Sequence, residues 1–286
     1  MSSSITEKQR ATAFGLLYAF SFAGSILASA IAAAIAFFFG YTIVFLIATP
    51  FVILAIISVL LKLEKCEMNA ERPVPSWKEL KEALTFKKSV TFLLFIACWG
   101  QFFAEFGNPY YLIFMQENLV APRYLLPMTQ VTMSTSSLIA GLSIGHLSSL
   151  MKRRKPLIVA AVLLASSGAG LATFSTSPYM MLAVYFLFGL SNVIGFACLQ
   201  TYFSEVGKAR SSLIWGTYLA FLWIGGIPSP FVSGLIAERY GLRLSFLIGM
   251  SGMTAEAFLL QIFFKEERTS GFTLMSSEKA GGQQRA

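Results

Sequence analysis

Residues 15–47 read GLLYAFSFAGSILASAIAAAIAFFFGYTIVFLI, and residues 216–248, GTYLAFLWIGGIPSPFVSGLIAERYGLRLSFLI, repeat their pattern without a gap. Eleven of the 33 aligned pairs are identical, and three of these are the glycine pairs Gly15/Gly216, Gly24/Gly225 and Gly40/Gly241. Each copy predicts a helix rich in small residues, a turn at the third glycine and a second apolar helix. Small residues let helix backbones approach closely in lipid, where no hydrophobic force brings helices together. The repeat therefore indicates a bundle of membrane helices built from related units.

The composition indicates that most of the chain lies in a membrane. Hydrophobic residues make up 56% of the 286 residues and charged residues only 13%, with a mean hydropathy of +0.67. A soluble domain has roughly 25% charged residues, and a domain of this size must show much polar surface to water. A membrane span needs about 20 apolar residues in helical form. Eight such runs predict an all-α, polytopic protein: 12–38, 42–61, 89–115, 125–150, 156–175, 179–203, 211–237 and 243–264.

The Lys and Arg residues divide unequally between the two sides of the predicted membrane. With eight spans both termini share one side, and nineteen of the 22 Lys and Arg residues fall there. Only Arg123, Arg239 and Arg243 fall on the other side. Because short basic loops stay in the cytoplasm, we expect a plasma-membrane protein with both termini cytoplasmic. The net charge of +8 is then a topology signal and gives no reason to expect a nucleic-acid partner.

The polar stretch from Lys62 to Lys88 is the one long connection between predicted spans. Ser76 and Glu79 within it have the spacing of a capping box, in which both side chains bond to helix-start amides. The apolar residues that follow fall on one helical face. We expect a short amphipathic helix on the inner leaflet, with a loosely ordered loop as the alternative.

The repeat offset of 201 residues separates the first span from the seventh, so one repeat unit comprises six helices. Six plus six helices joined by a long polar linker resembles the major facilitator superfamily of transporters. The resemblance implies that residues 1–61 correspond to helices 5 and 6 of an incomplete N-terminal half, 62–88 to the cytoplasmic linker, 89–264 to helices 7 to 12, and 265–286 to a cytoplasmic tail. The first four helices of the family would then come from a longer chain or a complementary fragment.

A second point of resemblance lies after the fourth span. The family often carries there a Gly, three variable residues, an Asp, and then Arg-x-Gly-Arg-Arg. Gly145, Arg153 and Arg154 match this pattern, while Ser149 stands in place of the Asp and Lys152 in place of the second Gly. The resemblance implies a gating role for this loop, and a plain positive-inside anchor is the alternative.

Polar side chains in the third span predict a site within the membrane. Gln101, Glu105 and Asn108 are spaced by four and three residues, so they share one helical face. Pro109 removes a backbone hydrogen bond near Glu105 and can kink or break the helix there. The resemblance implies that this helix lines a central cavity, where Glu105 would bind a proton or a cation. A structural, hydrogen-bonded carboxyl group is the alternative, since ionisable residues inside membranes are costly.

Other polar residues in the spans complete the candidate set. Asn192 in the sixth span and Tyr218 in the seventh are further candidates for solute contact. Glu256 in the last span is interpreted as a packing or snorkelling residue, because the last helix of the family is peripheral. No Lys or Arg falls well inside a span, which favours a neutral or cationic solute over an anion.

The residue types present in the sequence also distinguish between possible classes of function. One His, no Asp and no metal-binding or phosphate-binding motif argue against an enzyme, a metal site or a cofactor. The predicted function is a secondary transporter, or permease, that moves a small organic solute by alternating access, as part of a longer or assembled protein in contact with membrane lipids. A truncated, non-transporting membrane remnant or subunit is the alternative. Alternating access rocks one half against the other, and a chain with only two helices of one half cannot form the interface between halves alone.

Overall fold

The computed structural model describes residues 7–63, 88–122, 124–150, 153–207 and 210–266, and every element within them is a helix. In chain order these elements are α1 (Glu7–Phe39), α2 (Tyr41–Leu63), α4 (Lys88–Ala104), the 3₁₀ turn η1 (Asn108–Tyr110), α5 (Tyr111–Ile113), the π-helical turn η2 (Phe114–Asn118), α6 (Leu125–Leu150), α7 (Lys155–Phe174), α8 (Met180–Gly207), α9 (Ser211–Gly226), α10 (Ser229–Tyr240) and α11 (Leu242–Phe263).

Helices lie at each of the eight predicted spans, which confirms an all-α, polytopic membrane fold. By length and apolar character fewer than eight segments of the described chain qualify as membrane spans, so the count of eight stays a prediction. Within the described residues, α2 contributes a shorter apolar helix, Thr42–Ser58, and α6 carries a run of hydroxyl side chains. Six helical segments are long and apolar enough to cross a membrane: Phe20–Phe39, Lys88–Asn118, Lys155–Phe174, Met180–Gly207, Ser211–Tyr240 and Leu242–Phe263.

Two glycines at equivalent positions of the repeat turn the chain. Gly40 lies between α1 and α2 with φ of +80°, and Gly241 lies between α10 and α11 with φ of +87°. A side chain is strained in this left-handed region, whereas glycine adopts it readily. The turn predicted from the repeat is therefore confirmed in both copies.

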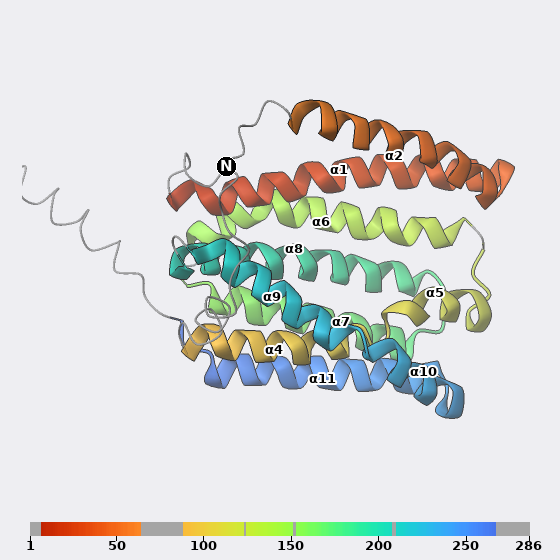
Figure 1. The fold of residues 1–286 in the computed structure, drawn as a ribbon. Helices are drawn as coiled ribbons and strands as arrows, with labels where there is room; N and C mark the ends of the chain where they lie inside the picture. The colour runs from red at the N-terminus through yellow and green to blue at the C-terminus, as the bar shows by residue number, and fades with distance from the viewer. Residues whose placement is uncertain (1–6, 64–87, 123, 151–152, 208–209, 267–286) are drawn as a thin grey trace, which may run out of the picture.

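The helices lie side by side, with α1 and α2 along one edge of the molecule and α4 and α11 along the opposite edge (Figure 1). Contacts run from α1 to α6, from α6 to α8, from α8 to α7, from α7 to α11, and from α4 to both α9 and α11. The first helix thus packs mainly on α6, far away in the sequence, and its neighbour α2 makes fewer contacts. Ser134 of α6 donates a hydrogen bond to the hydroxyl of Ser25 of α1 at 3.0 Å.

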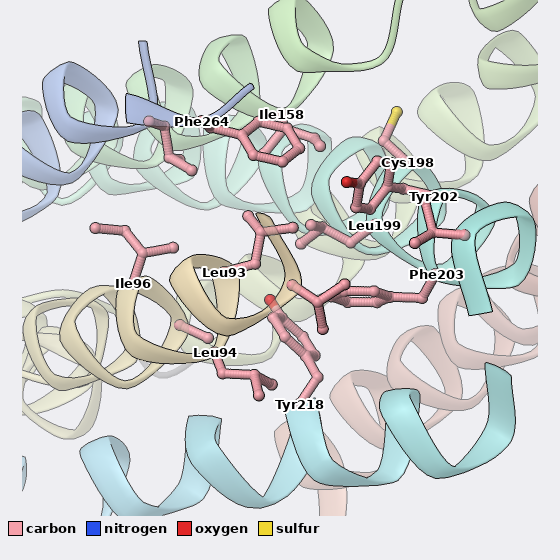
Figure 2. Packing of buried hydrophobic residues seen from close by; sticks show 14 of the residues in the cluster. Leu93, Leu94, Ile96, Ile158, Cys198, Leu199, Tyr202, Phe203, Tyr218 and Phe264 are labelled. Atoms are coloured by element: carbon pink, nitrogen blue, oxygen red, sulfur yellow. The ribbon is translucent and has the colours of Figure 1, made fainter. Parts of the chain in front are cut away.

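The larger of two buried clusters among the described residues joins α4, α7, α8 and α9 with Ile144 of α6, Leu260 of α11 and Phe264 just after it. In Figure 2, Tyr218 points from α9 toward Leu93 of α4 and Phe203 of α8. In lipid, such a cluster stabilises the bundle through close van der Waals packing between the helices rather than through a hydrophobic force. This cluster fixes α4 against α8 and α9. Gln101 lies on α4, and Glu105 and Asn108 follow its end.

Two parts of the predicted organisation lie outside the described residues. These are the amphipathic helix expected after Ser76 and most of the C-terminal tail, and both stay predictions.

Candidate functional site

The polar residues of the third span gather around one carboxylate. The amide of Gln101 donates to Oε1 of Glu105 at 2.8 Å, and the amide of Asn108 donates to its Oε2 at 2.9 Å. Glu105 and Gln101 are partly buried, and Asn108 is exposed. An ionised carboxylate offers about four lone-pair sites, so two amide donors leave acceptor capacity on both oxygens. The arrangement can therefore accept a further donor from a solute, a water molecule or a cation.

The carboxylate lies where the third span loses its helical form. Helix α4 ends at Ala104, and the chain resumes as the 3₁₀ turn η1 at Asn108. Pro109 cannot donate a backbone hydrogen bond to the preceding turn. The interruption predicted from Pro109 is thus present, and it frees the backbone around Glu105 from the regular helix.

A second helix break faces the first. Helix α9 ends at Gly226, and α10 begins at Ser229 after Ile227 and Pro228. A Cβ added at Gly226 would lie 3.2 Å from Cγ of Gln101 and 3.6 Å from Cγ of Glu105. The short contact is possible because Gly226 has no side chain.

Side chains connect the two broken helices directly. The hydroxyl of Ser229 donates to the backbone carbonyl of Phe102, and the hydroxyl of Tyr110 donates to the carbonyl of Pro230 at 2.9 Å. Phe102 lies in the last turn of α4, where backbone carbonyls lack intrahelical partners. We call the region formed by Gln101, Glu105, Asn108 and Gly226 the paired-break site.

The other two predicted solute contacts lie elsewhere. Asn192 of α8 lines a shallow hollow together with Phe22 of α1, Val193 and Phe196. Tyr218 is buried, and its ring stacks on Trp215 with centroids 5.3 Å apart. The structure therefore brings Gln101, Glu105 and Asn108 together, and it places Asn192 beside α1 and Tyr218 in the buried cluster.

The predicted gating loop lies at the end of the bundle that carries the Lys- and Arg-rich loops, which we call the basic end. Arg153 is exposed, and the Arg154 guanidinium forms a salt bridge with Glu205 near the end of α8. Glu266, just after α11, accepts hydrogen bonds from the backbone N–H groups of Arg154 at 2.7 Å and Lys155 at 3.2 Å. A carboxylate at a helix start is favourable, because the first N–H groups of a helix lack partners there. Arg154 and its neighbour thus join α7 to α8 and to the end of α11.

Sequence reasoning missed Glu205 and Glu266. Both follow directly on predicted spans, 179–203 and 243–264, at the side where Lys and Arg predominate. That placement of acidic residues among basic loops was the available signal. Gly145, the first residue of the motif, lies in α6, and its surroundings lie outside the part of the chain whose side chains the structure describes.

The described residues contain no group of three or more His, Cys, Asp and Glu side chains that could hold a metal ion. Of the two carboxyl groups predicted within the spans, Glu105 has amide partners on both oxygens.

Comparison with models of known protein families shows to which family the chain belongs. The family model of the Major Facilitator Superfamily matches residues 1–211 and 128–273. The chain belongs to the Major Facilitator Superfamily. It is thus a multi-pass membrane protein, in agreement with the apolar helices.

Curated relatives match shorter stretches of the chain. The sialic acid transporter NanX of Escherichia coli is 33% identical over 103 residues, which are 34% of this chain and 24% of NanX. The multi-drug resistance efflux pump PmrA of Streptococcus pneumoniae is 31% identical over 129 residues, which are 44% of this chain and 31% of PmrA. The matched part of the chain thus spans less than a third of the length of either relative.

Proposed function

We propose that this chain is part of a secondary transporter that moves a small organic solute by alternating access, with the paired-break site as its binding region. Glu105 is the site of a proton or a cation in this proposal. Residues 1–61 correspond to helices 5 and 6 of the family and residues 89–264 to helices 7 to 12, and both termini are cytoplasmic.

The paired-break site is the observation that supports this function best. Broken helices near the middle of a membrane expose backbone groups and so bind ions and polar solutes. Here two breaks lie next to each other, and Glu105 lies at one of them with both carboxylate oxygens held by amides. Ionisable residues inside a membrane are expensive and are retained mainly for function.

The two copies of the repeat support an assembled or longer protein. Gly225 of the second copy lies so close to α4 that an added Cβ would be 1.9 Å from the carbonyl oxygen of Cys98. The equivalent glycine of the first copy, Gly24, has no atom within 4 Å of an added Cβ. Because Gly24 is the repeat equivalent of Gly225, we infer that a helix equivalent to α4 packs against α1 at Gly24 in the complete transporter. A longer chain or a complementary fragment would supply it.

The solute proposed is neutral or cationic. The paired-break site contains a carboxylate and no Lys or Arg side chain among its described members. The names of the relatives point in two directions, since one transports sialic acid and the other is a multi-drug efflux pump. Uptake of radiolabelled sialic acid and of the cationic dye ethidium by the same proteoliposomes would compare an acid with a cation.

Glu105→Gln tests the role of the carboxylate. The substitution keeps the shape but removes the negative charge and the titratable proton, and the new NH2 group, which donates and cannot accept, leaves only one of the two amide contacts. Because a hydrogen bond to a charged group contributes about 1.5–3 kcal/mol, binding of a cationic solute should weaken roughly ten- to hundredfold. Uptake measured over a pH series should lose its pH dependence.

Glu117→Gln is the matched control, because Glu117 lies on the same span and is exposed. It should leave affinity and pH dependence unchanged. Equal behaviour of Glu105→Gln and the wild-type chain would show that Glu105 is a structural carboxyl group.

The second candidate function is a non-transporting remnant or subunit. The poorly covered surface of α1 and α2 favours it, since most side chains there are exposed. Flux in vesicles that contain this chain alone separates the two. Flux supports transport by the chain itself, and its absence together with flux in the presence of a fragment carrying the four missing helices supports a subunit.

A further inference from the structure

Glu256 lies in the middle of α11, well away from both ends of the helix. Its carboxyl group lies directly on Gly100 of α4: a Cβ added at Gly100 would be 2.3 Å from Oε1 and 2.4 Å from Oε2. The carboxyl group thus occupies the space that a side chain at position 100 would fill. Packing against a neighbouring helix, rather than snorkelling to the membrane surface, describes this residue.

The surroundings of Glu256 hold α11 tightly against α4. The indole N–H of Trp99 donates to the carbonyl of Gly252 at 3.1 Å, and the ring of Phe103 lies against the same glycine. Among the described residues, none forms a hydrogen bond or a salt bridge with the Glu256 carboxyl group. The contact is therefore a carboxyl group set into an apolar helix interface.

Among the residues that the structure describes, no Lys or Arg side chain forms a salt bridge with Glu256. Tyr218 of α9 is within electrostatic range of the carboxylate. Other ionisable side chains on or beside the elements packed nearby are Lys88 and Cys98 on α4, Glu105 just after it, Lys155 on α7, Arg210 before α9, Glu238, Arg239 and Tyr240 on α10, and Arg243 on α11.

The physical consequence is a contact that depends on protonation. An ionised carboxylate without a partner in an apolar environment is strongly unfavourable, whereas the neutral acid is tolerated. The neutral form can remain on Gly100, and the ionised form gains free energy by moving to water. Gly100 and Gln101 are neighbours on α4, so a movement at Gly100 reaches the helix end that carries Glu105.

We propose that Glu256 is a second proton-binding carboxyl group, which packs on Gly100 as the neutral acid and leaves Gly100 when it releases its proton to water. The step breaks only the O–H bond of the acid and needs no other reactant. The proposal goes beyond the paired-break site and holds whether or not the chain transports a solute by itself.

Infrared spectroscopy of the full chain in lipid nanodiscs tests it without a transport assay. Protonated carboxylic acids give a carbonyl stretching band that ionised carboxylates lack. The difference between wild-type and Glu256→Gln spectra should contain this band at low pH and lose it as the pH rises. The band should persist in Glu105→Gln, which separates this proposal from the role of Glu105. A Glu256 band present at every pH, or absent at every pH, would overturn the proposal.

Gly100→Ala provides the second variant, in case Glu256→Gln does not fold. The alanine methyl group takes the place of the carboxyl group, and the flexible Glu256 side chain can swing away at little cost. The pH at which the band disappears should therefore change. Gly216→Ala is the control, since an added Cβ there meets no atom within 4 Å, and it should leave that pH unchanged. An unchanged pH in Gly100→Ala as well would refute the packing of the acid on Gly100.

Discussion

Replacing Gly225 by alanine should separate α9 from α4 and prevent the chain from forming a stable bundle. The new Cβ would lie 1.9 Å from the backbone carbonyl oxygen of Cys98. A backbone atom in the middle of a helix cannot move away as a side-chain tip can, so the two helices must shift apart. Overpacking of this kind costs roughly 1–3 kcal/mol, and more where nothing can relax. The same shift would displace Gly226 from Gln101 and so open the paired-break site.

Gly216→Ala on the same helix is the matched control for this prediction. Its added Cβ meets no atom within 4 Å, so its stability should stay within about 0.5 kcal/mol of the wild type. Thermal unfolding in detergent can be followed with a thiol-reactive dye, because Cys198 is buried in the folded chain. Equal melting temperatures for the two alanine variants would mean that α4 and α9 are not in backbone contact.

Replacing Arg154 by alanine should loosen the basic end of the bundle. Its salt bridge to Glu205 joins α7 to α8, and the two side chains are only 17% and 19% exposed. Exposed ion pairs contribute about 0–1 kcal/mol, but a pair this well covered is less screened by water. We expect a loss near the range of about 1.5–3 kcal/mol for hydrogen bonds to charged groups. High salt should reduce the difference from the wild type.

Arg153→Ala is the control for the charge itself, because Arg153 is the exposed neighbour in the same loop. It should change stability by no more than about 0.5 kcal/mol. The double variant Arg154→Glu with Glu205→Arg should recover part of the loss, since it restores opposite charges. Equal effects of the two single alanine variants would argue for a general loss of positive charge and against a specific bridge. Such a result would leave the loop as a positive-inside anchor.

The helix breaks show how far local sequence signals reach. Pro109 and Pro228 each mark the place where a span loses its helical form, because proline lacks the N–H group that a helix needs. The interruption near Glu105 was therefore predictable from the third span alone. That the two breaks face each other was not, because the contact between Gly226 and Gln101 joins residues far apart in the chain.

The candidate site also has features that the sequence predicted and features that only the tertiary structure decided. The spacing of Gln101, Glu105 and Asn108 gave their common face, since residues three and four apart are neighbours on any helix. Tyr218 was named as a candidate solute contact, and its ring lies in the buried cluster, so a contact with solute stays a prediction. Which way an aromatic side chain in an apolar helix points depends on the partners around it, and an apolar sequence carries little periodicity to reveal them.

The sequence by itself determined that the chain lies in a membrane, where its apolar helices run, the turns at Gly40 and Gly241, and the break at Pro109. These follow from composition, from run length and from the backbone chemistry of glycine and proline, which act within a few residues. The tertiary structure alone decided that Glu205 and Glu266 meet the start of α7, that Glu256 lies on Gly100, and that Gly225 touches α4. These contacts join separate helices, and their geometry depends on how whole helices pack, so no local pattern specifies them.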